Sequence, residues 1–149
     1  MATNNRTAGD IGELSSRLRL AIARSARRMR QEAGTDLSPS LTSALATIER
    51  HGPLTPSELA ELERVQRPSA TRIVSRLETE GLVARAADPA DGRSSLVSAS
   101  ARGRALLRRL RTRKNAYLAR RLRDLSDGDV ETLREAADVL ERLLEGERS

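Results

Sequence analysis

The sequence predicts a mainly α protein with one small β hairpin and with long helices at both ends of the chain. Apolar residues recur every three or four positions over most of the 149 residues, which is the period of helices that bury one face. Only the stretch from Leu82 to Ser100 alternates as strands do, around turn-forming residues at 88–92. The single aromatic residue is Tyr117, so the core has to be aliphatic.

The composition excludes several classes of function. Cysteine is absent, so disulfides, thiolate metal sites and thiol-based redox sensing are ruled out. His51 is the only histidine, which argues against a zinc site of the usual composition. The sequence also shows no nucleophile and base pair and no phosphate-binding glycine loop. We therefore predict no enzyme activity, no cofactor and no metal.

The N-terminal residues 1–9 are polar and predict a flexible leader rather than a signal peptide or a membrane anchor. This favours a cytoplasmic protein without a membrane partner. Asp10 is the expected N-cap of a first helix, within 10–34, that stops at Gly34. The apolar stripe of this helix consists of Ile11, Leu14, Leu18, Ile22, Ala26 and Met29.

Two further helices are predicted from their caps. Ser38, followed by proline, begins a helix that stops near His51. Thr55 to Glu58 form a capping box for a third helix, with Leu59 and Leu62 as its expected core residues.

A fourth helix opens at Pro68, lasts to Glu80 and is closed by Gly81. Two short helices separated by a tight turn form a helix-turn-helix. The strands that follow, Leu82–Arg85 and Ser94–Ser100, form a hairpin that we call the wing. Residues 35–100 are thus predicted to be a winged helix-turn-helix domain.

Residues 101–149 return to helix, first to about Leu125 and then from Ser126 to about Glu145. Ten basic residues and no acid lie between 102 and 123, whereas eight acids lie between 127 and 147. These opposite charges predict that the two helices lie near each other or near their equivalents in a second copy.

The fourth helix has two distinct faces. Ala70, Ile73, Val74 and Leu77 share the face expected to pack inward. The opposite face carries Ser69, Arg72, Ser75, Arg76 and Thr79. Arginine can bind both major-groove acceptors of guanine, and hydroxyls reach phosphates or base edges, so this face suits DNA reading. The alternative is that the arginines are ordinary solvated surface residues.

Two segments resemble the MarR family of bacterial regulators. Thr71 to Glu78, followed by Gly81, Leu82, Val83 and Arg85, is similar to the family's recognition helix and first wing strand. The second segment is similar to its wing signature, with Asp88, Pro89, Asp91, Gly92, Arg93, Leu96, Val97, Ser98, Ser100 and Gly103. Ala99 departs from the leucine usual there. The resemblance covers about residues 54–107.

The resemblance implies a homodimer whose N- and C-terminal helices interlock while two winged domains straddle a palindromic site. It also implies that Arg93 at the wing tip enters the minor groove and that Asp91 steadies it, which suits the negative potential of a narrow groove. The alternative is a local ion pair that stiffens the hairpin. The expected DNA-binding residues are Arg67, Ser69, Thr71, Arg72, Ser75, Arg76, Asp91 and Arg93.

Dimerisation is also favoured by leucine stripes that look too long for one small domain to cover. The expected dimerisation residues are Ile11, Leu14, Leu18, Val130, Leu133, Ala137, Leu140 and Leu144. Members of the family often bind small phenolic or carboxylate effectors between the dimer helices and the winged domain. Arg24 and Arg28 are our candidates for contacting such an anion, with plain surface charge as the alternative.

The net charge of +6 and the isoelectric point of 11.1 favour an anionic partner. We therefore predict a homodimeric, MarR-like transcription regulator that represses from a palindromic operator and is released by a small anion. Two alternatives remain: an architectural DNA-binding protein without effector control, and a helical protein-interaction module whose arginines reflect genome composition.

Overall fold

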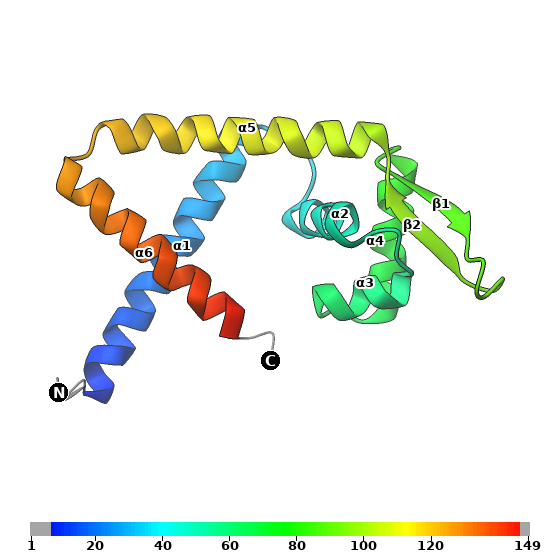
Figure 1. The fold of residues 1–149 in the computed structure, drawn as a ribbon, viewed down its shortest axis with the longest axis horizontal. Coiled ribbons are helices and arrows are strands. Elements are labelled where there is room, and N and C mark those ends of the chain that lie inside the picture. Colours follow the sequence, from blue (N-terminus) through cyan, green and yellow to red (C-terminus); the bar gives the residue numbers. More distant parts are fainter. Residues whose placement is uncertain (1–6, 147–149) are drawn as a thin grey trace.

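The computed structural model describes residues 7–146, which form six helices and two strands (Figure 1). In chain order they are α1 (Ala8–Ala33), α2 (Pro39–His51), α3 (Pro56–Glu63), α4 (Arg67–Thr79), β1 (Val83–Ala87), β2 (Ser95–Ala99), α5 (Ala101–Arg123) and α6 (Asp127–Glu145). Figure 1 shows α5 as a long bar, with α2 to β2 at one end and α1 and α6 toward the other. The predicted fold class is confirmed.

Hydroxyl side chains cap most of the helices. Ser38, Thr55 and Ser126 accept hydrogen bonds from backbone amides of the first turn, as predicted. The cap of α1 differs from the prediction, because Thr7 is the N-cap and Asp10 closes the capping box from the third helical position. Hydrogen bonds from the side chain and backbone of Thr7 hold the pKa of Asp10 below its ordinary value.

Helix α1 therefore begins at Ala8, inside the segment predicted as a leader. The rest of that prediction, residues 1–6, lies outside the described residues, as do residues 147–149. Gly34 ends α1 in the left-handed conformation (φ 66°), the role expected of it.

The core lies between α2, α3, α4 and the sheet. Its fully buried side chains include Leu45, Ile48, Leu54, Leu59, Val74, Leu77 and Val97. The prediction that Leu62 joins this core is wrong, because its side chain is 49% exposed. The inward side of α3 instead carries Leu59 and Ala60, which are buried. Glu63, one turn after Leu59 on the same side, accepts hydrogen bonds from Ser43 and Thr47 on α2.

The wing is an antiparallel hairpin in which Val83 pairs with Ala99 and Ala87 with Ser95. The first strand thus starts one residue later and reaches two residues further than predicted. Leu54, between α2 and α3, exchanges two backbone hydrogen bonds with Val97, at 3.0 and 2.7 Å, and so ties the hairpin to the domain.

A compact joint connects α4, the wing and α5. Ser100 caps α5 by accepting from the amide of Gly103, and its hydroxyl donates to the carbonyl of Gly81 at 2.7 Å. The backbone of Gly103 lies so close to Leu82 that a Cβ there would stand 2.2 Å from the Leu82 oxygen. The direction of α5 relative to α4 is therefore fixed by backbone contact.

The outer helices bury little in one chain. Helix α1 packs against α5 near Ala33, whose carbonyl accepts from Arg113 at 2.8 Å, and α6 has no buried residue. No ion pair joins α5 to α6 in the described part of the chain, so their opposite charges are not paired with each other. Between residues 7 and 146, no helix is long and apolar enough to cross a membrane.

Candidate nucleic-acid interface

Helix α4 presents its arginines to solvent. Ala70, Val74 and Leu77 are fully buried and Ile73 is half-buried, so the predicted inward face is confirmed. Of the residues predicted to read DNA, Ser69 is half-buried; the exposed ones are Arg67, Thr71, Arg72, Ser75 and Arg76. Most of the polar face of α4 is thus exposed, with Ser69 as the half-buried member.

Several polar side chains of α4 form hydrogen bonds within the helix itself. The hydroxyls of Thr71 and Thr79 donate to backbone carbonyls one turn earlier, at 3.0 and 2.9 Å. Arg72 donates to the Ser69 hydroxyl at 3.3 Å, a long bond on an exposed surface. These hydroxyls retain acceptor capacity, and the guanidinium of Arg72 retains several donors.

Arg85 on β1 connects the wing to α4. It donates to Glu78 at 3.1 Å and to the Ser75 hydroxyl at 3.2 Å, and its side chain is 29% exposed. Because both partners lie on α4, this arginine joins the hairpin to the polar side of the helix. Ser75, predicted as a DNA contact, is therefore also a structural acceptor.

At the wing tip, Asp91 orders the turn that carries Arg93. Its carboxylate accepts from the Arg93 amide at 3.0 Å, and its carbonyl accepts from the Ser94 amide at 3.0 Å. This is an Asx turn. Within residues 7–146, the exposed Arg93 side chain makes no ion pair with Asp91, so Asp91 orders the turn through its bonds to the two backbone amides.

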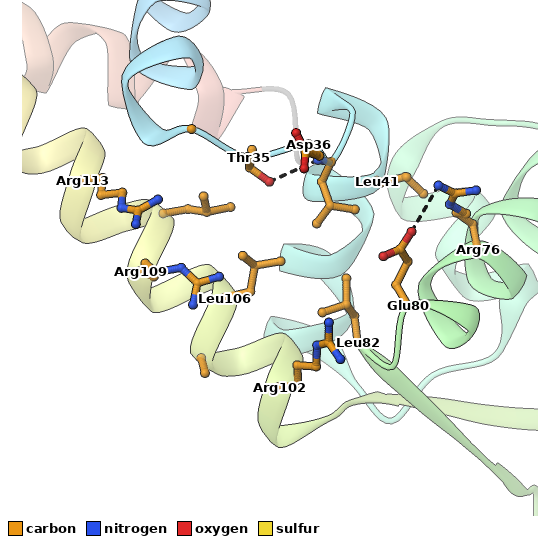
Figure 2. Close-up of a pocket in the computed structure, with 14 residues that line it drawn as sticks. Thr35, Asp36, Leu41, Arg76, Glu80, Leu82, Arg102, Leu106, Arg109 and Arg113 are labelled. Carbon is orange, nitrogen blue, oxygen red and sulfur yellow. Dashed lines mark hydrogen bonds and ion pairs between the residues drawn. The ribbon is translucent and has the colours of Figure 1, made fainter.

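A cleft of about 500 Å³ lies between α5 and the winged domain (Figure 2). Its apolar lining comes from both sides, with Leu37, Leu41 and Leu82 from the winged domain and Leu106 and Leu110 from α5. Three arginines of α5 share one stripe at i, i+7 and i+11 and line the cleft: Arg102, Arg109 and Arg113. Arg76 of α4 faces them, paired with Glu80, and Asp36 is the other acid. Arginines outnumber carboxylates, so the cleft favours an anion.

Comparison with known sequences decides the family. A profile of the MarR family matches residues 37–95. An uncharacterized HTH-type transcriptional regulator of Mycobacterium bovis is 40% identical over 133 residues, which are 89% of this chain and 93% of that relative. The chain belongs to the MarR family.

Solved structures agree with this assignment. A protein of Pseudomonas aeruginosa described as a transcriptional regulator is 33% identical, with a TM-score of 0.83 over 93% of this chain and 98% of that one. A mutant of S. aureus MepR bound to an oligodeoxyribonucleotide is 17% identical and shares the fold, with a TM-score of 0.68 over 88% and 97% of the two chains. The protein is a MarR-family, DNA-binding HTH transcriptional regulator.

In this MarR-family regulator, the residues predicted to dimerise lie on the outer helices. Val130 and Leu140 are half-buried. The others are exposed in the single chain, namely Ile11, Leu14, Leu18, Leu133, Ala137 and Leu144.

The residues predicted to hold an effector of the MarR-family regulator are also exposed, on α1. Arg28 pairs with Glu32 at 3.3 Å, and neither Arg24 nor Arg28 lines the cleft. The three cleft arginines of α5 were missed by sequence reasoning, although their spacing on one helical stripe was a readable signal. Arg85 was noted only as part of the family motif, because its contacts to α4 depend on the tertiary fold.

Proposed function

We propose that this MarR-family regulator is a homodimeric repressor that binds a palindromic operator through α4 and the wing. The observation that supports this best is the open, arginine-bearing face of α4 beside a hairpin tipped by Arg93. In this proposal α4 enters the major groove, where base or phosphate contacts come from Arg67, Ser69, Thr71, Arg72, Ser75 and Arg76. Arg93, with its turn held by Asp91, enters the flanking minor groove.

A second copy of the chain would cover the outer helices. In the single chain, Leu14, Leu133 and Leu144 are 47, 48 and 63% exposed, more apolar surface than an isolated domain ordinarily leaves on its helices. The acidic α6 and the basic α1 and α5 also offer complementary charge between copies. In a two-fold dimer the α4 helices would enter successive major grooves about 10 to 10.5 base pairs apart.

Selection of bound duplexes from a random pool tests the proposal directly. We expect a palindrome whose half-sites have this spacing. Titrating salt with the selected and a scrambled duplex then separates a specific regulator from an architectural protein, because only the former keeps a specificity ratio of about a thousandfold or more. Recovery of no consensus sequence would contradict the proposal.

We further propose that a small phenolic or carboxylate anion binds in the cleft and releases the operator. This proposal is supported by the lining of the cleft, where four arginines are interspersed with five leucines, a combination that fits an anionic group on an apolar body. Arg109 is exposed and has no ion pair or hydrogen bond among residues 7–146, so it is a better candidate contact than Arg24 or Arg28.

Calorimetric titration with 4-hydroxybenzoate tests the effector site. We expect Arg109→Gln to weaken binding about tenfold, the effect of losing one charge-assisted hydrogen bond. Arg108→Gln removes the same charge from the neighbouring exposed position outside the cleft and should bind normally. Equal binding by both variants would place the anion elsewhere.

A further inference from the structure

Arg76 belongs to two surfaces of the molecule at once. Ser69, Arg72 and Arg76 follow each other at i, i+3 and i+7, so they share one stripe of α4. Ser69 is half-buried and Arg72 is exposed, which places this stripe at the border between the packed and the open face of the helix. Arg76 is the member of the stripe that also lines the cleft.

In the free chain Arg76 is held on the cleft side. Its guanidinium pairs with Glu80, one turn later on α4, at 3.1 Å, and Figure 2 shows the pair beside Leu41, across the cleft from the arginines of α5. Glu80 lines the same cleft together with Asp36, Arg102, Arg109 and Arg113. The partner of Arg76 in the free chain is therefore a carboxylate of the chain itself.

The pair can be exchanged for another anion. The side chains of Arg76 and Glu80 are 64% and 41% exposed, and an ion pair this exposed is weak because water screens it. A DNA phosphate or a guanine edge can replace the carboxylate as partner of the guanidinium, because each offers acceptor oxygens or nitrogens to the same donors.

We propose that Glu80 competes intramolecularly with DNA for Arg76. Glu80 holds the guanidinium toward the cleft, and operator binding has to break this pair before Arg76 can reach the duplex. The inference rests on the proposed function. It links the proposed effector cleft to the proposed DNA-binding surface, because Arg76 belongs to both. Glu80 thereby lowers operator affinity through Arg76, rather than only through its own charge.

A double-mutant cycle tests this link with the full-length protein and the selected operator duplex. We expect Glu80→Gln to tighten operator binding about two- to fivefold, the range of an exposed ion pair. In an Arg76→Gln background the same substitution should change affinity less than about 1.5-fold, because no guanidinium remains to be released. Fluorescence anisotropy at fixed salt measures all four proteins.

Glu61→Gln is the matched control, since Glu61 is exposed on the neighbouring α3 and has no ion pair among the described residues. It removes the same charge and should have the same small effect in both backgrounds. An equal gain from Glu80→Gln with and without Arg76, or no gain in the wild-type background, would overturn the inference. Thermal unfolding of the four proteins checks that the exposed substitutions leave the fold intact.

The two proposals fail in distinguishable ways. A wild-type protein that binds the selected and a scrambled duplex equally contradicts the proposed function and this inference with it. A protein that keeps its specificity while the cycle shows no coupling contradicts only the role of Glu80.

Discussion

Arg72 and Arg76 lie four residues apart on α4 but are held differently. Among residues 7–146, Arg72 makes only the 3.3 Å bond to Ser69, so its donors can turn to a guanine without breaking an ion pair there. We expect Arg72→Ala to lower operator affinity by about 1 to 3 kcal/mol and to relax base preference at one position in each half-site. Mobility-shift titrations with single-base operator variants measure both effects.

Arg108→Ala is the control for Arg72, because it removes an exposed arginine of α5 and should leave base preference unchanged. If Arg72→Ala discriminates among the operator variants as the wild type does, Arg72 does not read bases.

Arg93 should act through groove shape. Its backbone is fixed by Asp91 while its guanidinium is exposed, so the side chain can enter a narrow, A·T-rich minor groove where the negative potential is strongest. We expect Arg93→Ala to weaken binding by about 1 kcal/mol or more on operators with A·T-rich flanks and less on G·C-rich flanks. Sizing chromatography should show an unchanged assembly. A loss that ignores the flanking sequence would indicate a phosphate contact instead.

At the scale of elements, helix boundaries could be predicted where a nearby residue bonds the free backbone groups at the helix end or adopts the turn that ends the helix. Ser38, Thr55 and Ser126 are such caps, and Gly34 is a residue that tolerates φ above zero. Leu62 was misplaced because hydrophobicity alone does not say which side of a two-turn helix faces inward. The bonds of Glu63 to α2 decide that, and they join residues 16 and 20 positions apart.

The joint at Gly103 fixes where α5 leaves the winged domain. A methyl group there would lie 2.2 Å from the Leu82 oxygen and 3.2 Å from Leu45, so the backbones would have to separate. We expect Gly103→Ala to lower the free energy of unfolding by about 1 to 3 kcal/mol, measured by urea titration. Gly128→Ala, in the first turn of α6 with room for a Cβ, should be neutral or stabilising. A stable Gly103→Ala variant would show that the joint can shift.

At the scale of the whole molecule, the DNA-reading face could be predicted because it lies on one helix and follows its period. The cleft could not be predicted in this way. Its lining comes from the α1–α2 connection, α2, α4, the α4–β1 connection and α5, which only the tertiary fold brings together. The positions of Arg24 and Arg28 illustrate this: charge and helix membership suggested an anion contact, but the cleft opens on the stripe of α5 that carries Arg109.

Substitutions in the apolar seam of α6, formed by Val130, Leu133, Ala137, Leu140 and Leu144, test whether the chain dimerises through this helix. Leu133 and Leu140 share a stripe with Val130 and Leu144, whereas Val139 lies off that stripe although it is similarly exposed, at 47% against 48% for Leu133. If a second copy covers the seam, the double variant Leu133→Gln and Leu140→Gln loses four buried leucines per dimer. At about 1.5 kcal/mol or more for each leucine, or about 6 kcal/mol in total, the dimer dissociation constant should rise by about ten-thousandfold or more.

Sedimentation across micromolar concentrations measures this change, and Val139→Gln should sediment as the wild type does. Operator affinity should fall in parallel for the seam variant, because a monomer can place only one α4 helix in a groove and loses the gain from binding two linked half-sites. A seam variant that remains dimeric would locate the interface elsewhere on the outer helices. A wild-type protein that is monomeric throughout the range would remove the two-fold geometry on which the palindromic operator depends.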